Sequence, residues 1–133
     1  MITIKEAGEK DFKDLAILYN NIGCALKRNG AIHILAKEDE SILGFCCVSM
    51  DGESLPVIDA IFVKEDERLK GIGDGLLRAT INLFRNKGDS YMMARKREDT
   101  VDFLRHEGML DSDDHLWCDI NKFFNKKCKG SRG

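Results

Sequence analysis

The stretch RLKGIGDGLL, residues 68–77, places a basic pair and three closely spaced glycines at the start of an apolar pattern of helical period. Each glycine inside a helix costs about 1 kcal/mol relative to alanine, so their presence here needs a reason. Glycines let a backbone approach a ligand closely and point successive N–H groups the same way. With the positive end of the helix dipole and the charges of Arg68 and Lys70, they predict a metal-free site for a di- or polyphosphate with an extended organic arm.

Two other phosphate-binding loops do not fit this stretch. A Walker A loop needs Gly-Lys followed by Ser or Thr, whereas Lys70 precedes Gly71. A GxGxxG fingerprint counted from Gly71 fails because its last position is Leu76. The pattern that remains, Arg68-x-x-Gly71-x-Gly73, is either a phosphate-binding turn or a glycine-tolerant connection between a strand and a helix.

A candidate for proton transfer precedes the glycines. Asp59 is the only acid inside an otherwise apolar strand, and the two-residue period of a strand predicts that it shares a face with Ile61 and Val63. It is either a general base or a partly solvated carboxylate near a strand end. Weaker candidates for the base are Glu53 and His33. His33 alternates with apolar neighbours and is either solvated or merely packed.

Ten elements in the order β-α-β-β-β-α-β-α-β-β must position these residues. Hydrophobic periodicity and turn signals predict strands at 2–5, 31–40, 41–50, 55–63, 90–96, 108–112 and 115–120, and helices at 11–21, from the glycines to about 87, and from 98 or 99 to 108. Residues 20–30 are predicted as a loop or frayed helix, and residues 50–55 as a turn. This order predicts an α/β (α+β) domain with a mixed central sheet flanked by helices.

Length and charge limit the class of protein. The 133 residues fit one domain, which we place at residues 1–125, followed by a basic, frayed tail at 126–133. With 43% hydrophobic and 33% charged residues the chain is an ordinary globular protein. The net charge of −2 gives no general positive field, which argues against nucleic acid as a partner.

The five cysteines form no CxxC pair and no metal-ligand spacing, so they predict free thiols in a reducing compartment. The sequence MITIKEAGEK lacks the apolar region of a signal peptide, and no apolar run approaches membrane-spanning length. We therefore expect a cytoplasmic protein that does not associate with membranes.

Residues 58–84, IDAIFVKEDERLKGIGDGLLRATINLF, resemble motif A of the GNAT superfamily of N-acetyltransferases. That motif is an apolar strand ending in Val, a short link, and Arg/Gln-x-x-Gly-x-Gly/Ala at the start of a long helix. The resemblance extends to the strand order, to the hairpin DESILGFCCVSMDG and to the segment FLRHEGM before a final pair of strands, and covers most of residues 1–120. It implies the GNAT fold and acetyl-CoA as co-substrate, without a metal.

The resemblance also implies which residues contact acetyl-CoA, in a V where strands 58–64 and 90–95 splay apart. The backbone of Ile61, Phe62 and Val63 would pair with the pantetheine arm like an added strand. The amides from Leu69 to Gly75 would hold the pyrophosphate, flanked by the side chains of Arg68 and Lys70. These amides belong to Leu69, Lys70, Gly71, Ile72, Gly73, Asp74 and Gly75.

Transfer would be direct in a protein of this family. A substrate amine attacks the thioester carbonyl, an N–H near Val63 polarises its oxygen, and Asp59 lies on the strand that often supplies the base.

Two positions depart from the family pattern. The family's usual acid is a Tyr four residues before a helix-ending glycine, and counting back from Gly108 this position is Leu104. A leucine cannot protonate a leaving thiolate, although a CoA thiol is a fair leaving group without an acid. The family's frequent Asn at the start of the same helix falls on Arg97, which either contacts a CoA phosphate or is solvated.

The leading interpretation is an N-acetyltransferase that transfers acetyl from acetyl-CoA to a primary amine of a small molecule or peptide. Leu104 favours the alternative, an acyl-CoA-binding module with little or no turnover. A third hypothesis is a nucleotide-binding protein that uses the same glycine-containing loop for ATP or another phosphate. The short segment before the second strand predicts an acceptor site that is either open or completed by a second subunit in a homodimer.

Overall fold

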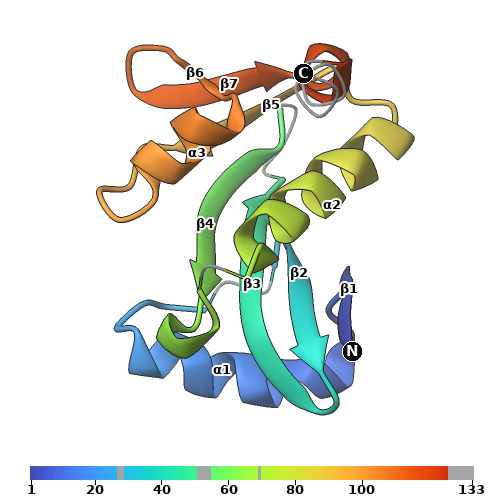
Figure 1. Cartoon of the computed structure of the whole chain (residues 1–133), viewed down its shortest axis with the longest axis vertical. Coiled ribbons are helices and arrows are strands. Elements are labelled where there is room, and N and C mark those ends of the chain that lie inside the picture. Colours follow the sequence, from blue (N-terminus) through green and yellow to red (C-terminus); the bar gives the residue numbers. More distant parts are fainter. Residues whose placement is uncertain (27–28, 51–54, 69, 126–133) are drawn as a thin grey trace.

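A computed structural model describes residues 1–26, 29–50, 55–68 and 70–125. Figure 1 shows a twisted sheet with helices on both of its faces. The strands are β1 (Ile2–Glu6), β2 (Ala31–Glu38), β3 (Ser41–Ser49), β4 (Val57–Val63), β5 (Tyr91–Arg95), β6 (Leu110–Asp111) and β7 (His115–Asp119). The α-helices are α1 (Phe12–Asn21), α2 (Ile72–Asn86) and α3 (Val101–Glu107), and the short 3-10 helices are η1 (Glu9–Asp11) and η2 (Glu65–Glu67).

The sheet has the strand order β1-β2-β3-β4-β5-β7-β6. Strands β1 to β4 are antiparallel neighbours, β4 and β5 are parallel, and β5, β7 and β6 are again antiparallel. The predicted element order and the mixed sheet are confirmed. The short helix begins later than expected, at Val101 with Thr100 as its cap, and most of the predicted turn at 50–55 lies outside the described residues.

Helix α2 forms because its apolar residues recur at helical spacing and face the sheet. The buried ones are Ile72, Leu76, Leu77, Thr80, Ile81 and Phe84. The hydroxyl of Thr80, the one polar member, donates to the Leu76 carbonyl at 2.7 Å. The helix ends at Asn86, and Gly88 takes a φ of +98°, which suits the glycine that commonly terminates a helix.

Two hydrophobic cores lie on opposite faces of the sheet. The smaller one joins α1 to β2 and β3, through Leu15, Leu18, Tyr19, Leu35, Ile42, Phe45 and Cys47. The larger one joins α2 and α3 to the other face and includes Ile58 and Ile61 of β4. Because β4 contributes to both cores, its two faces look into different halves of the molecule.

The end of the described chain contains a helical turn that the sequence analysis missed. Residues 120–125 are helical, and the Asp119 carboxylate accepts the N–H of Lys122 at 3.1 Å, as a helix-capping residue does. Phe123 is buried and Phe124 lies 4.5 Å below the Arg85 guanidinium. Asp119 followed by this apolar pair was the available signal. The tail at 126–133 lies outside the described residues, and within them no helix is long and apolar enough to cross a membrane.

Candidate active site

The sheet opens at a bulge in β4. The register of β4 against β3 shifts at Asp59, which lies between Ile58 and Ala60 and has no partner of its own on β3. A bulge bends its strand and increases the local twist. The parallel pairing of β4 with β5 ends at the same place, with the pair Ile58–Ala94. Residues 60–63 therefore have an edge free of β5, and Figure 1 shows the two strands diverging.

The N-terminus of α2 lies beside this opening. Gly71, which precedes the helix, has a φ of +78°, in the left-handed region that favours glycine. The N–H groups of Ile72, Gly73 and Asp74 have no carbonyl one turn earlier in the helix. The N–H of Gly75 bonds to the Gly71 carbonyl at 3.0 Å, inside the first turn of the helix. An anion here would meet three amides and the positive end of the helix dipole.

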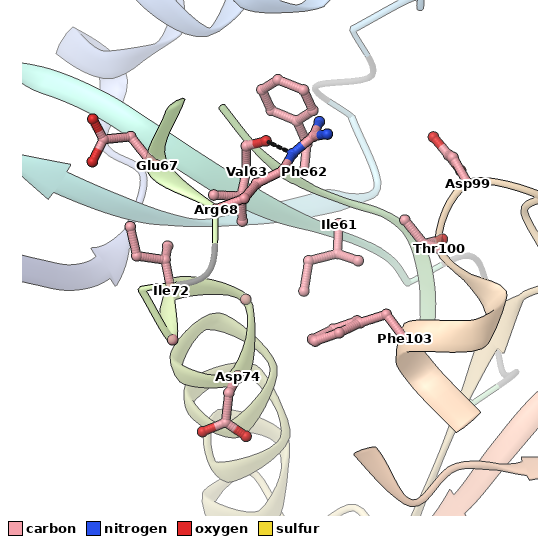
Figure 2. A pocket seen from close by; sticks show the side chains of 12 residues that line it. Ile61, Phe62, Val63, Glu67, Arg68, Ile72, Asp74, Asp99, Thr100 and Phe103 are labelled. Carbon is pink, nitrogen blue, oxygen red and sulfur yellow. Dashed lines mark hydrogen bonds between the residues drawn. The ribbon is translucent and has the colours of Figure 1, made fainter. Parts of the chain in front are cut away.

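A cavity of about 440 Å³ lies between β4, the start of α2 and α3, within the usual range for small-molecule sites. Figure 2 shows Ile61 of β4 and Phe103 of α3 pointing toward the space between these elements. Gly73 closes one side, because a Cβ placed on it would lie 3.2 Å from the Phe103 ring. We call this the α2-side cavity; it is lined by Ile61, Phe62, Val63, Glu67, Arg68, Gly71, Ile72, Gly73, Asp74, Asp99, Thr100 and Phe103.

Arg68 is held at the mouth of this cavity. Its Nε donates to the carbonyl of Val63 at 2.9 Å, which Figure 2 draws as a dashed line. Its Nη groups have no hydrogen-bond partner among the described residues. The guanidinium is thus fixed on one side and available on the other.

Most residues predicted to bind the co-substrate line the α2-side cavity. They are Ile61, Phe62, Val63, Arg68, Gly71, Ile72, Gly73 and Asp74. Three others lie elsewhere. Lys70 pairs with Glu67 at 2.9 Å and is 56% exposed, Gly75 packs against Ile4, and Arg97 lines a different cavity. Leu69 lies outside the described residues.

Gly75 has a packing role that the sequence analysis did not foresee. A Cβ on it would lie 2.9 Å from the Cδ1 of Ile4 in β1, so the glycine lets α2 approach the far strand of the sheet. Its N–H is also used inside the helix. Of the three glycines, only Gly71 and Gly73 shape the α2-side cavity.

A second cavity, of about 220 Å³, lies on the α1 side of β4. It shares Ile61, Phe62, Arg68 and Asp99 with the first, so the two cavities are separated by little more than β4. We call it the α1-side cavity. Its other lining residues are Tyr19, Ile22, Cys24, Ala25, Cys47, Asp59, Ala60 and Arg97.

Asp59 lines the α1-side cavity with both carboxylate oxygens engaged. Oδ1 accepts the Nε of Arg95 at 2.6 Å, and Oδ2 accepts the hydroxyl of Ser49. The carboxylate is 21% exposed. Each neighbouring strand therefore supplies one donor that orients it.

The expectation that Asp59 shares a face with Ile61 and Val63 is wrong. Ile61 and Val63 belong to the α2-side core, whereas Asp59 lines the α1-side cavity with Ala60. The reason is the bulge, which breaks the two-residue alternation. The sequence VIDAIFV does not predict this bulge, because the strand buries apolar residues with or without it.

Of the two weaker base candidates, His33 lies within the described residues and is not placed to act. His33 is 1% exposed, its Nε2 lies 2.7 Å from the Tyr19 hydroxyl, and it packs edge-on against Phe12. Burial lowers the pKa of His33 to about 4 and raises that of Tyr19, so both are uncharged near neutral pH. The sequence left open whether His33 is solvated or packed, and the structure shows that it is packed. Glu53 lies outside the described residues.

The helix that carries the family's acid presents apolar residues instead. Leu104 is 1% exposed in the large core, and its neighbour Phe103 lines the α2-side cavity. Asp99, Thr100 and Phe103 were not singled out in the sequence. The segment that follows β5 brings them to the cavity. No local pattern in a single sequence predicts the course of that segment.

No group of three or more His, Cys, Asp or Glu side chains among the described residues could hold a metal ion.

Comparison with known proteins agrees with this geometry. The sequence model of the acetyltransferase (GNAT) family matches residues 4–109, and the chain therefore belongs to that family. No curated protein matches the sequence.

Solved structures share the fold at low sequence identity. Ard1 from Thermoplasma volcanium is 16% identical with a TM-score of 0.72, over 89% of this chain and 97% of that one. A GNAT acetyltransferase from Staphylococcus aureus is 14% identical with a TM-score of 0.69, over 90% and 99%. N-acetylglutamate synthase from Neisseria gonorrhoeae, complexed with coenzyme A and N-acetyl-glutamate, is 16% identical with a TM-score of 0.75, over 90% of this chain and 35% of that one.

Proposed function

We propose that the protein is an N-acetyltransferase that transfers acetyl from acetyl-CoA to a primary amine of a small molecule or peptide. The observation that carries this proposal is the parting of β4 and β5 beside the N-terminus of α2. That arrangement offers a free strand edge and the N-terminal end of a helix in one cavity. The coenzyme A in the complex of N-acetylglutamate synthase, which has the same fold, supports the choice of co-substrate.

The residues of the α2-side cavity fit the parts of acetyl-CoA. The free edge of β4 at Ile61–Val63 suits the amides of the pantetheine arm, as in strand addition. The amides of Ile72, Gly73 and Asp74 suit the pyrophosphate, and the free Nη groups of Arg68 add a charged donor.

Acetyl-CoA would supply an activated thioester, and the chain's own groups would serve the amine. The acceptor amine would bind in the α1-side cavity, which adjoins the α2-side cavity because Ile61 and Phe62 line both. Asp59 is the base we propose, since it is the β4 acid that lines this cavity. A backbone N–H near Val63 would polarise the thioester oxygen.

Binding and turnover are tested separately. A ligand that binds only the folded state stabilises it by RT ln(1 + [L]/Kd), so saturating acetyl-CoA or CoA is expected to raise Tm by about 5–10 °C. ATP serves as the matched phosphate control and is expected to give no comparable shift. Absence of a shift with CoA, or an equal one with ATP, would contradict the proposal. Thiol release against a panel of amines then measures transfer.

Leu104 favours a second candidate, an acyl-CoA-binding module with little turnover. A buried leucine stands where a proton donor would act, and Phe103 lines the cavity beside it. A CoA-induced rise in Tm, together with no thiol release in the presence of any amine, would favour this second function.

We also propose a cytoplasmic location. The four described cysteines, Cys24, Cys46, Cys47 and Cys118, are all free thiols, which suits a reducing compartment.

A further inference from the structure

We propose that the acceptor is a small amine that carries a carboxylate, of about the size of an α-amino acid, and that Arg97 binds this carboxylate. The inference rests on the proposed function and names the substrate class of its acceptor side. Acetyl would move from the sulfur of CoA to the amine nitrogen, forming an amide bond and breaking the C–S bond. One proton would pass from nitrogen to the released thiol.

The size of the α1-side cavity supports a small acceptor. Its 220 Å³ is below the roughly 300 Å³ at which pockets for drug-sized ligands begin. Apolar groups of Ile22, Ala60 and Phe62 form part of its wall, so polar recognition must come from a few charged side chains. Those are Asp59, Asp99, Arg68 and Arg97.

The charges around this cavity leave Arg97 only weakly paired. Asp59 is already paired with Arg95, a residue that does not line the cavity. Asp99 is 69% exposed and lies 3.5 Å from the Nε of Arg97, a surface contact that contributes little. With Arg68 assigned to the pyrophosphate of CoA, Arg97 is the lining cation that remains for a ligand with an anionic group.

Arg97 lines the α1-side cavity with a firmly held backbone and a weakly held guanidinium. Its N–H bonds to the Arg95 carbonyl at 3.1 Å, and its own carbonyl accepts the N–H of Val101 at 2.8 Å, so its backbone is fixed in the segment between β5 and α3. The side chain is 39% exposed. Its Nη2 lies 3.8 Å from the Sγ of Cys24, a weak contact that a carboxylate can replace.

The test compares amines that differ only in the carboxylate. Thiol release is measured with saturating acetyl-CoA for the twenty standard amino acids, for their amides, and for the corresponding decarboxylated amines. We expect kcat/KM to be at least about 10-fold higher for the acids that react than for their amides. Intrinsic reactivity would favour the amides at neutral pH, because their amines are less basic. Equal use of acids and amides would overturn the inference and leave the acetyltransferase function standing.

Substitution of Arg97 identifies the binding group. Arg97→Gln is expected to lower kcat/KM for the acids by about 10- to 100-fold, mainly through KM, and to abolish the preference over amides. Arg97→Lys should restore part of it. The rise in Tm with CoA should stay unchanged in both variants. Arg78→Gln, at an exposed position of α2, is the matched control. An unchanged preference in Arg97→Gln would assign the carboxylate to another group and overturn the inference.

A binding measurement keeps the inference testable in the absence of turnover. The Tm of the protein, with and without saturating CoA, is recorded with each amino acid and with its amide. A rise that requires the carboxylate and is lost in Arg97→Gln supports the site even when no thiol is released. Absence of any acid-specific rise, together with no acid-specific transfer, overturns it. Failure of the proposed function would instead appear as the absence of any CoA effect.

Discussion

Asp59 lies where β4 parts from β5, and each neighbouring strand supplies one donor to its carboxylate. Ser49 of β3 and Arg95 of β5 occupy one site on each oxygen. A carboxylate has about four lone-pair sites, so each oxygen can still accept a further proton donor. An amine in the α1-side cavity could therefore bond to Asp59 without displacing either partner.

The proposed base is tested with Asp59→Asn. The amide keeps the shape but cannot take a proton, so kcat should fall by about 100-fold or more. The rise in Tm with CoA should persist, because the side chain lines the other cavity. Asp114→Asn, in the exposed turn between β6 and β7, is the matched control. Unchanged thiol release would remove Asp59 from this role.

Buried His33 predicts a pH dependence of stability that is independent of activity. Burial lowers its pKa to about 4 in the folded protein, against about 6.5 when unfolded. Between these values the unfolded state binds more protons, so the free energy of unfolding should fall as pH drops from about 6.5 to 4, by about 3 kcal/mol. Urea unfolding at a series of pH values measures this slope.

His33→Gln is the control for that slope, because an amide oxygen can still accept the Tyr19 hydroxyl. The variant should show a flatter dependence over the same range. If its slope between pH 6.5 and 4 equals that of the unmodified protein, other groups are responsible for the loss.

At the scale of elements, the three glycines at the start of α2 have different structural roles. Gly71 permits the left-handed turn into the helix, and Gly73 lets the first turn approach Phe103. Gly75 lets the helix approach Ile4 of β1. Helix entry, the cavity wall and the packing against the sheet are thus set within five residues.

Alanine substitutions should separate these roles. Gly71→Ala should lower stability by about 1–2 kcal/mol, because a side chain is disfavoured at positive φ, and should weaken CoA binding.

Gly75→Ala combined with Ile4→Val, which removes the clashing Cδ1, should be more stable than Ile4→Val alone by up to about 1 kcal/mol, with CoA binding kept. Chemical unfolding and CoA titration measure both. Loss of CoA binding in the double variant would assign Gly75 to the binding site.

The elements were predictable from the sequence because each has a periodic apolar pattern, and motif A identified the strand and helix that line the α2-side cavity. The bulge at Asp59 was not predictable, since VIDAIFV satisfies either register. Nor could the sequence place Tyr19, Cys24 and Arg97 around one cavity, because they meet only when α1, the loop after it and the end of β5 pack together. Local patterns determine the elements, whereas the α1-side cavity depends on tertiary packing.

At the scale of the molecule, β4 separates two cavities that lie beside different helices. The α2 face carries the proposed co-substrate site, and the α1 face carries the proposed acceptor site. We therefore expect the position of α1 to matter for binding of the acceptor and little for binding of CoA. One buried ion pair links the start of α1 to the sheet: Asp11, which precedes the helix, lies 2.9 Å from Lys37 of β2.

Breaking this pair should affect stability and acceptor binding together. Asp11 also accepts the N–H of Gly8, and both contacts hold the pKa of its carboxyl below the usual value of 3.8. Its contribution to stability is thus full above about pH 4 and is lost as pH falls below that. Asp11→Ala leaves the Lys37 ammonium buried and unpaired, which costs about 3–5 kcal/mol, whereas Asp11→Ala with Lys37→Met should recover part of that loss.

Thermal unfolding and thiol-release kinetics on the same variants check whether α1 serves the acceptor side. Because Tyr19 and Ile22 belong to α1 or follow it directly and line the α1-side cavity, loosening the start of the helix should raise KM for the amine. The Kd for CoA should change little, because the α2-side cavity contains no residue of α1. A variant that loses stability but keeps both constants would show that the far end of α1 is held independently of Asp11. A parallel loss of CoA affinity would show instead that the two faces of β4 are mechanically coupled.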